Sequence, residues 1–171
     1  DLRKGIHYLG MAAKALGNKN YDFRVAGNVT DAVRNHELTK HLNFLGRVPR
    51  AEMKEEFLKA DVFVLPTLAE GCASVVHEAV MAGCPVITTH ASGTLVAHDR
   101  GGMIVPERDP EALAAAIAEI VENRDRRDEL AASCGPLSEE LSEDRWSERL
   151  MAALTDPSPK KILADVNQLK A

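Results

Sequence analysis

The 171-residue sequence lacks several features that mark common functional classes. Aromatic residues make up only 4%, and no apolar run approaches the roughly 20 residues that a bilayer-spanning helix requires. Lysine and arginine, at 21, are outnumbered by 26 aspartates and glutamates, for a formal net charge of −5. The sequence therefore has no basic surplus of the kind that binds nucleic acid by neutralising phosphates. We expect no nucleic acid partner and no membrane span within this segment.

Cysteine is scarce as well. Cys72, Cys84 and Cys134 are an odd, scattered set without Cys-x-x-Cys spacing, and no histidine cluster is arranged like a zinc site. We expect a reducing cytoplasmic location and no metal. The first residues, 1–5, include no initiator methionine, apolar signal segment or cleavage pattern. We interpret this start as the middle of a longer polypeptide.

What is present is typical of one α/β domain. Hydrophobic residues make up 45% and charged residues 27%, and apolar segments of strand length alternate with segments of helical period. This alternation predicts βαβ units around a parallel sheet flanked by helices. We expect helices near 6–17, 50–60, 74–83, 110–123, 125–134 and 143–154, a weaker one near 31–40, and strands near 22–26, 42–46, 61–65, 85–89 and 103–105.

Several local patterns sharpen this prediction. Residues 62–65 form a continuous apolar run, as expected of a central parallel strand that is deeply buried on both faces. Asp109 followed by Pro110 predicts a capped helix start. Trp146 is expected to anchor the last helix by packing. Residues 156–159, Asp-Pro-Ser-Pro, end that helix and release a weakly periodic tail.

The stretch from Leu65 to Thr89 carries the most information about function. It is predicted to be a strand, a loop with Glu70 and Gly71, a helix, a tight turn and the next strand. Ligands of open α/β sheets bind outside the carboxyl ends of the strands, where this loop lies. Gly71 and the small residues Cys72, Ala73 and Ser74 leave backbone N–H groups uncovered at the helix start. Such a helix start favours a phosphate oxygen.

Two carboxylates eight positions apart suit recognition of sugar hydroxyls. At about 100° per residue, Val76, Ala79 and Val80 share one arc of the helix with Val75, whereas Glu78 lies on the other. Ionised carboxylates only accept hydrogen bonds, so Glu70 and Glu78 could each take hydrogen bonds from paired hydroxyls.

These motifs together resemble the retaining group-one glycosyltransferases (glycosyltransferase family 4-like) of the two-domain GT-B fold. The resemblance covers roughly residues 2–150. It rests on 60–66 (Ala-Asp-Val-Phe-Val-Leu-Pro), the Glu70-x7-Glu78 pair, 78–87 (Glu-Ala-Val-Met-Ala-Gly-Cys-Pro-Val-Ile), Arg3-Lys4-Gly5, 44–48 (Phe-Leu-Gly-Arg-Val), 102–106 (Gly-Met-Ile-Val-Pro) and 109–113 (Asp-Pro-Glu-Ala-Leu), which follow the family's order. It implies a Rossmann-like three-layer domain over 1–154 that binds the donor, followed by a tail or helix over 155–171.

The resemblance also implies site residues. Lys4 would contact the donor diphosphate, Glu70 the transferred sugar and Glu78 the ribose. The backbone of Gly71, Cys72, Ala73 and Ser74 would hold the distal phosphate, and the segment around Val48 would lie near the base. No metal or cofactor is implied, because Lys4 and the helix N-terminus can neutralise the leaving diphosphate.

The implied activity is transfer of a sugar from a nucleoside diphosphate sugar, with a separate N-terminal domain supplying the acceptor site and any peripheral membrane contact. The sequence departs from the family pattern at Cys72, Ala73, His77 and Thr94, where a large apolar residue, a glycine, an apolar or aromatic residue and an acidic residue are usual. An alternative is therefore a catalytically silent nucleotide-sugar-binding fragment or subunit. A dinucleotide-dependent oxidoreductase is disfavoured, because no Gly-x-Gly-x-x-Gly follows a predicted strand.

In the family fold, a strand that precedes the Arg3-Lys4-Gly5 motif occupies the middle of the sheet. We therefore expect the strands near 22–26 and 61–65 not to pair with each other. Residues upstream of Asp1, or another segment, would fill the slot between them.

Overall fold

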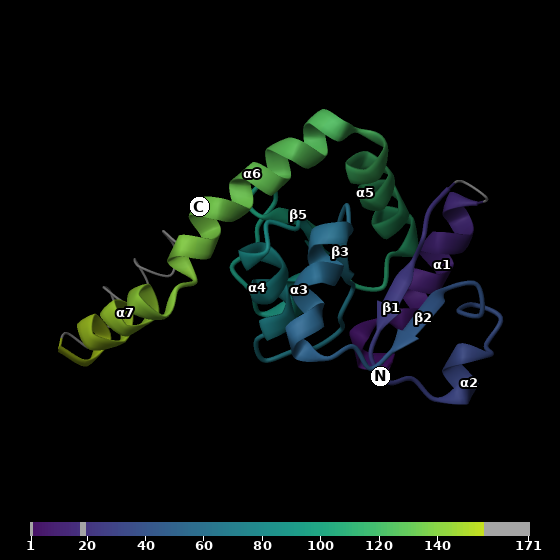
Figure 1. Cartoon of the computed structure of the whole chain (residues 1–171), viewed down its shortest axis with the longest axis horizontal. Coiled ribbons are helices and arrows are strands. Elements are labelled where there is room, and N and C mark those ends of the chain that lie inside the picture. Colours follow the sequence, from purple (N-terminus) through teal and green to yellow (C-terminus); the bar gives the residue numbers. More distant parts are fainter. Residues whose placement is uncertain (1, 18–19, 156–171) are drawn as a thin grey trace.

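The computed structural model describes residues 2–17 and 20–155, and the predicted tail beyond Thr155 lies outside them. Helices and strands alternate along the chain, as predicted (Figure 1). The elements are η1 (Leu2–Lys4), α1 (Ile6–Leu16), β1 (Arg24–Ala26), α2 (Asp31–Arg34), β2 (Asn43–Gly46), α3 (Arg50–Lys59), β3 (Phe63–Leu65), α4 (Ser74–Met81), β4 (Val86–Thr88), η2 (His90–Ser92), β5 (Gly102–Ile104), α5 (Pro110–Glu122), α6 (Arg124–Glu140) and α7 (Glu143–Thr155).

The strands form two parallel groups. β1 pairs with β2, and β4 lies between β3 and β5. No ladder joins β1 to β3 in the part of the chain that the structure describes. This confirms the sequence prediction that the strands near 22–26 and 61–65 do not pair with each other.

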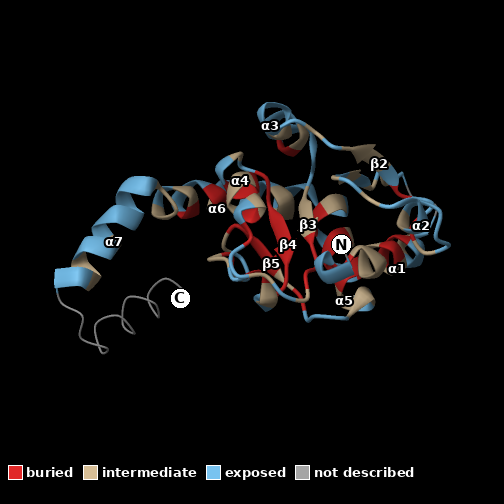
Figure 2. Ribbon diagram, turned by 90° about the horizontal axis from the view of Figure 1, so that it is seen from below, coloured by how far each residue is buried: buried red, intermediate tan, exposed pale blue. Residues whose placement is uncertain are grey.

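Helices cover both faces of the β3–β4–β5 group, which gives the three layers expected from the sequence. Consecutive residues of β4 point to opposite faces: Val86 joins one apolar cluster and Ile87 the other. Val86 packs among side chains of α3, α4 and α6, whereas Ile87 packs among side chains of α1 and α5. Figure 2 shows β4 as the most continuously buried strand.

The expectation that residues 62–65 are deeply buried is wrong for most of that run. Only Leu65 is buried, at 7% exposure, and Val62, Phe63 and Val64 are half-buried. The cause is the position of β3, which pairs with β4 on one side and, within the described residues, with no strand on the other. The fully covered central strand is β4, not β3.

Each of the predicted helices is present, and two of them differ clearly in length from the prediction. The predicted start at Asp109 is confirmed, because its carboxylate accepts a hydrogen bond from the Ala112 amide at 2.8 Å, with Pro110 in the first turn. α6 continues to Glu140 instead of ending near 134, with Pro136 in its interior. Burial of Leu130, Cys134 and Leu137 along one side of α6 holds the helix past the proline. α2 is a single turn and ends at Arg34.

The last helix does not pack as expected. α7 extends away from the sheet (Figure 1) and has no buried residues. Trp146 is 58% exposed, so the prediction that it anchors α7 by packing is wrong. Across residues 2–17 and 20–155, no helix has the length and apolarity needed to cross a membrane.

Candidate functional site

Three buried threonines join the carboxyl ends of β3 and β4. The Thr88 hydroxyl donates to the Leu65 carbonyl at 2.8 Å, and the Thr89 hydroxyl donates to the Thr67 carbonyl at 2.6 Å. The Thr67 hydroxyl donates in turn to the Arg3 carbonyl at 3.1 Å. Because all three threonines are at most 1% exposed, these bonds hold the loop after β3 against both the next strand and the start of the chain.

Gly5 brings the first turn of the chain against the same loop. Its φ is 76°, and a Cβ at this position would lie 1.9 Å from the Pro66 carbonyl oxygen. Only glycine permits both the left-handed conformation and this close approach. The Leu68 amide donates to the Arg3 carbonyl at 2.8 Å, which fixes η1 on the loop. Lys4 therefore lies beside a segment more than 60 positions away in the sequence.

Lys4 and Glu70 meet at this point. The Lys4 ammonium lies 3.1 Å from Glu70 Oε1, and the Arg3 guanidinium lies 4.0 Å from the same oxygen. The Glu70 side chain is 13% exposed, whereas that of Lys4 is 46% exposed. Glu70 Oε1 is buried and has no hydrogen-bonding partner among the described residues, so the contact with Lys4 is an ion pair. The carboxylate is thus held in place with unused capacity to accept hydrogen bonds.

The start of α4 lies directly after this loop. The first bond at the helix start runs from the Val76 amide to the Ala73 carbonyl, so the amides of Ser74 and Val75 precede it. No side chain caps this end. The Ala73 amide differs from the expectation, because it donates to the Ser92 carbonyl at 3.0 Å. Within the described part of the chain, the amides of Gly71, Cys72, Ser74 and Val75 have no backbone acceptor and remain as donors for an anion.

The loop between β4 and β5 supports this arrangement. The Glu70 amide donates to the Ala91 carbonyl at 2.8 Å. A Cβ on Gly93, whose φ is 64°, would lie 2.4 Å from the Gly71 carbonyl oxygen. The two loops therefore touch backbone to backbone, which fixes Gly71 and Cys72 beside the first turn of α4.

Glu78 lies one turn further along α4, on the side opposite the core. Val76, Ala79 and Val80 are buried, as the helical periodicity predicts, and the Glu78 side chain is 34% exposed. Glu78 Oε1 lies 3.4 Å from the guanidinium of Arg50, whose side chain is 90% exposed. A pocket of about 290 Å³ between α3 and α4 is lined by Arg50, Met53, Lys54, Phe57, Glu78, Met81 and Ala82. Glu70 does not line this pocket.

Val48 follows β2 and is half-buried in the loop that leads to α3. Gly46, with a φ of 71°, ends β2, and its carbonyl accepts a hydrogen bond from the Gly27 amide at 2.7 Å. This loop follows the carboxyl end of β2, as the loop before α4 follows that of β3. β2 and β3 belong to different groups of strands, so no ladder among the described residues fixes the position of Val48 relative to Glu70.

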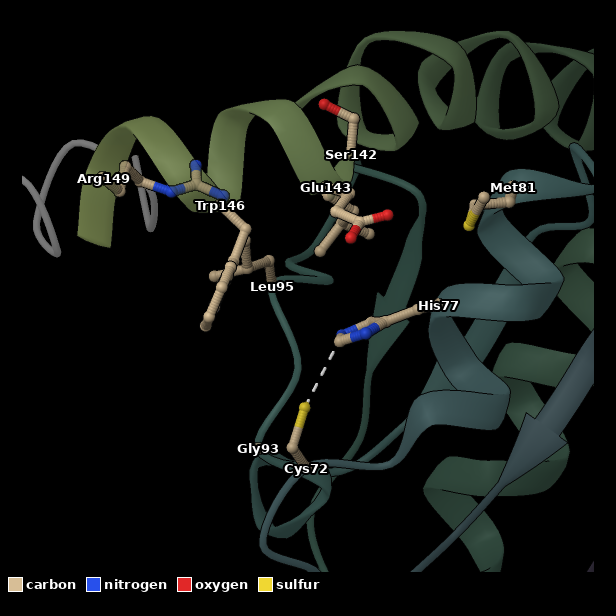
Figure 3. A pocket seen from close by; sticks show the side chains of 10 residues that line it. Cys72, His77, Met81, Gly93, Leu95, Ser142, Glu143, Trp146 and Arg149 are labelled. Atoms are coloured by element: carbon tan, nitrogen blue, oxygen red, sulfur yellow. Dashed lines mark hydrogen bonds between the residues drawn. The ribbon is translucent and has the colours of Figure 1, made fainter. Parts of the chain in front are cut away.

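A second pocket, of about 590 Å³, opens on the other side of α4 (Figure 3). Its lining comes from the loop before α4, from α4, from the loop after η2, from the junction of α6 and α7, and from the first half of α7. The lining residues are Cys72, His77, Met81, Gly93, Leu95, Leu141, Ser142, Glu143, Trp146 and Arg149. In Figure 3, His77 extends from α4 toward Cys72, with its Nε2 3.9 Å from the Cys72 sulfur. Burial lowers the pKa of His77.

The structure thus brings Lys4, Glu70, Gly71, Cys72 and Ser74 to one edge of the sheet, with Glu78 on the far side of α4 from the core. Sequence reasoning missed the threonines, whose only signal was their place at the ends of predicted strands. It also missed the contact between Cys72 and His77, which depends on the path of the loop. Among residues 2–17 and 20–155, no group of three or more His, Cys, Asp and Glu side chains is placed to hold a metal ion.

Comparison with known proteins assigns the family. The model of the family described as "Glycosyl transferases group 1" matches residues 1–136, which is most of the chain. This chain belongs to the group 1 glycosyltransferases. The matched region includes Lys4, Glu70 and Glu78, but not the residues from Leu141 onward that line the second pocket.

Curated members of the family are similar over about two thirds of this chain. The putative colanic acid biosynthesis glycosyltransferase WcaL of Salmonella typhimurium is 31% identical over 133 residues, covering 68% of this chain and 33% of its own length. A GDP-mannose-dependent mannosyltransferase of Mycobacterium tuberculosis, which acts on a phosphatidylinositol monomannoside, is 32% identical over 126 residues, covering 68% and 32%. The chain spans about one third of the length of these group 1 glycosyltransferases.

Solved structures of group 1 glycosyltransferases and related enzymes share the fold. Anabaena HepE in complex with UDP superposes with a TM-score of 0.74 at 20% identity, covering 91% of this chain and 45% of HepE. The C-terminal domain of LpcC from Francisella tularensis superposes with a TM-score of 0.69 at 21% identity, covering 80% and 78%. The architecture of this chain is thus that of one domain of a GT-B glycosyltransferase.

Proposed function

We propose that this domain binds the nucleoside diphosphate sugar donor of a retaining glycosyltransferase. The observation that carries the proposal is the contact of Lys4 with Glu70 beside the uncapped start of α4. A cation, a carboxylate with unused acceptor capacity and open backbone amides are thereby grouped at the edge of the sheet where α/β domains bind ligands. A donor with a diphosphate and a sugar needs these three kinds of group.

Each group has a role that follows from its chemistry. The Lys4 ammonium and the amides of Cys72 and Ser74 stabilise the negative charge that develops on the leaving diphosphate. The Glu70 carboxylate accepts hydrogen bonds from hydroxyls of the transferred sugar and fixes its orientation. Since Lys4 holds Glu70 in place before the donor arrives, the site is organised in advance.

The nucleoside half of the donor would lie at the pocket between α3 and α4, which Glu78 and Arg50 line. Glu78 can accept hydrogen bonds from ribose hydroxyls, and Arg50, which now pairs with it, is exposed enough to move aside. The loop around Val48 would border the base. We propose that transfer needs no metal or cofactor, because Lys4 and the helix start together supply the positive charge. The retaining outcome rests on the resemblance of residues 65–89 to enzymes of that class.

The donor class is supported by what similar proteins bind. HepE was solved with UDP and with UDP-glucose, and the mycobacterial relative depends on GDP-mannose. We propose that a second domain supplies the acceptor site and that transfer takes place between the two. We further propose a cytoplasmic location, with any peripheral membrane contact made through the acceptor domain.

Nucleotide titration of the chain tests this proposal. UDP and GDP should bind, and Glu78→Ala should weaken the preferred nucleotide by about 1–3 kcal/mol through loss of the ribose acceptors. Arg50→Ala is the matched control, because it breaks the same ion pair but keeps the carboxylate. If Arg50→Ala weakens binding as much as Glu78→Ala, the ion pair and not the carboxylate is what the nucleotide requires, and the ribose assignment fails.

A second candidate is a catalytically silent subunit that binds a nucleotide sugar. The departures at Cys72 and Ala73 favour it, since both residues adjoin the proposed phosphate site. Titration with several nucleotide sugars, scored for both binding and turnover in a protein that includes the acceptor domain, separates the two functions. Binding without turnover of any tested donor would favour the silent subunit.

A further inference from the structure

The three thiols of the chain differ sharply in their surroundings. Cys84 and Cys134 are buried, at 3% and 0% exposure, and burial raises the pKa of Cys84 to about 12 and that of Cys134 to about 11. Both stay protonated near neutral pH and are closed to reagents. Cys72 is exposed. Any chemistry at sulfur in the described chain is therefore concentrated at Cys72.

Cys72 also has a base beside it. His77 Nε2 lies 3.9 Å from its sulfur, close enough for proton transfer after a small adjustment of either side chain. Burial lowers the pKa of His77, which favours the neutral imidazole, the form that can accept the thiol proton. A nucleophile paired with a neutral imidazole is the arrangement that activates a thiol.

The pair faces a space large enough for a ligand. The 590 Å³ pocket in Figure 3 places Leu95 and the exposed ring of Trp146 across from Cys72, with Glu143 and Arg149 contributing one charge of each sign. Pockets of this size accommodate small organic molecules. A zwitterionic group attached to the sulfur could lie in this space.

We propose that Cys72 and His77 form a reversible thiol-modification site, at which a low-molecular-weight disulfide attaches a small thiol to Cys72. The loop that carries Cys72 also carries the backbone donors proposed for the diphosphate. The adduct would obstruct that approach and lower donor affinity; this second part rests on the proposed function.

The reaction is a thiol–disulfide exchange. The Cys72 S–H proton passes to His77 Nε2, and the resulting thiolate attacks one sulfur of the reagent. A new bond forms between Cys72 Sγ and that sulfur while the reagent's own S–S bond breaks. The leaving thiolate takes up the proton, so one free thiol is released for each chain modified. Excess thiol reverses the exchange.

Intact-mass measurement of the full chain with glutathione disulfide tests the modification site. One adduct per chain should form, and Cys72→Ser should abolish it. His77→Gln should slow adduct formation about tenfold, whereas His98→Gln, at another exposed histidine, should leave the rate unchanged. The reaction rate per cysteine in the urea-unfolded chain is the reference for a thiol without structured neighbours. The site is disproved if native Cys72 reacts no faster than this reference, or if Cys84 or Cys134 reacts equally.

The effect on the donor site is measured separately. Titration with UDP and GDP before modification, after it and after reduction should show a loss of affinity of tenfold or more that reduction restores. Unchanged affinity of the modified chain would overturn the obstruction and leave the thiol site standing. If neither nucleotide binds the reduced chain, the proposed function and the obstruction fail together, and the mass measurement still decides the thiol site.

Discussion

A single glycine controls whether Lys4 can reach Glu70. Gly5 adopts a left-handed conformation at the end of η1 and lies against the Pro66 carbonyl, so the turn that carries Lys4 approaches the loop after β3 more closely than any other residue would permit. The side chains that are proposed to act on the donor are therefore positioned by a residue without a side chain. Gly5 therefore contributes both to the stability of the domain and to the geometry of the proposed site.

We predict that Gly5→Ala destabilises the domain by more than 2 kcal/mol. The left-handed conformation alone costs an alanine about 1–2 kcal/mol, and the Cβ would additionally overlap the Pro66 carbonyl oxygen. Gly83→Ala is the matched control, because Gly83 has a φ of 77° but no atom within 4 Å of an added Cβ. Urea unfolding of both variants measures the difference. Equal losses would show that the contact with Pro66 is relaxed in solution.

The residue-level predictions from sequence succeeded where the pattern was local. The helical period predicted the burial of Val76, Ala79 and Val80 in α4, although Val75 on the same arc is only half-buried. The Asp109-Pro110 pair predicted a cap that the structure contains. The engaged amide of Ala73 could not be predicted, because its acceptor is the carbonyl of Ser92 in a different loop. Nothing in the residues between them specifies that the two loops touch.

At the scale of elements, α6 shows burial overriding local propensity. Gly135 and Pro136 are both exposed in its interior, yet the helix runs on to Glu140. Leu137, fully buried one turn after Cys134, packs against the cluster that includes Val80 and Val86. The proline removes one backbone donor at an exposed position, and the apolar contacts beyond it offset this loss. The sequence prediction ended the helix near 134 because such contacts cannot be inferred from a short window.

We predict that α6 can be stabilised at these two positions. Gly135→Ala should raise the free energy of unfolding by about 0.5–1 kcal/mol through helix propensity, since an added Cβ meets no atom within 4 Å. Pro136→Ala should also be stabilising, because it restores the missing amide donor. Leu137→Ala, next in sequence but buried, should cost about 2–5 kcal/mol. Chemical denaturation monitored by circular dichroism tests the series, and a destabilising Pro136→Ala would mean that the bend at the proline is required for packing.

At the scale of the whole molecule, the two groups of strands differ in their pairing and in their burial. β4 is paired on both sides and buried on both faces. Among the strands of residues 2–17 and 20–155, β1 and β2 pair only with each other, and neither contains a buried residue. The parallel α/β class and the separation of β1 from β3 were both predicted from sequence. The reduced burial of β3 was not predicted. An apolar run shows that a strand is hydrophobic, but it does not show whether the strand is paired along both edges.

We predict a corresponding gradient in hydrogen exchange. The amides of Ile87 in β4 and Met103 in β5 should exchange only through global unfolding, while those of Val25 and Phe44 should exchange through a local opening of lower free energy. Mass-spectrometric or NMR exchange at neutral pH measures both sets. Uniform protection across the two groups would show that β1 and β2 are part of the same cooperative unit as β3, β4 and β5.

The last prediction concerns activity. The chain spans about one third of the length of the curated relatives. We propose Lys4, Glu70 and Ser74 as contacts for a donor, and we propose no residue of the chain as a contact for an acceptor. We therefore expect the 171-residue chain to bind a nucleoside diphosphate yet transfer no sugar to a saccharide or lipid acceptor.

Radiolabelled UDP-glucose and GDP-mannose, each incubated with the chain and with a protein that adds an acceptor domain, provide the test. Hydrolysis of the donor is scored alongside transfer, because a domain that binds and activates the donor can release its sugar to water. Transfer by the 171 residues alone would show that both substrates bind this domain, and the assignment of the acceptor to a second domain would have to be abandoned.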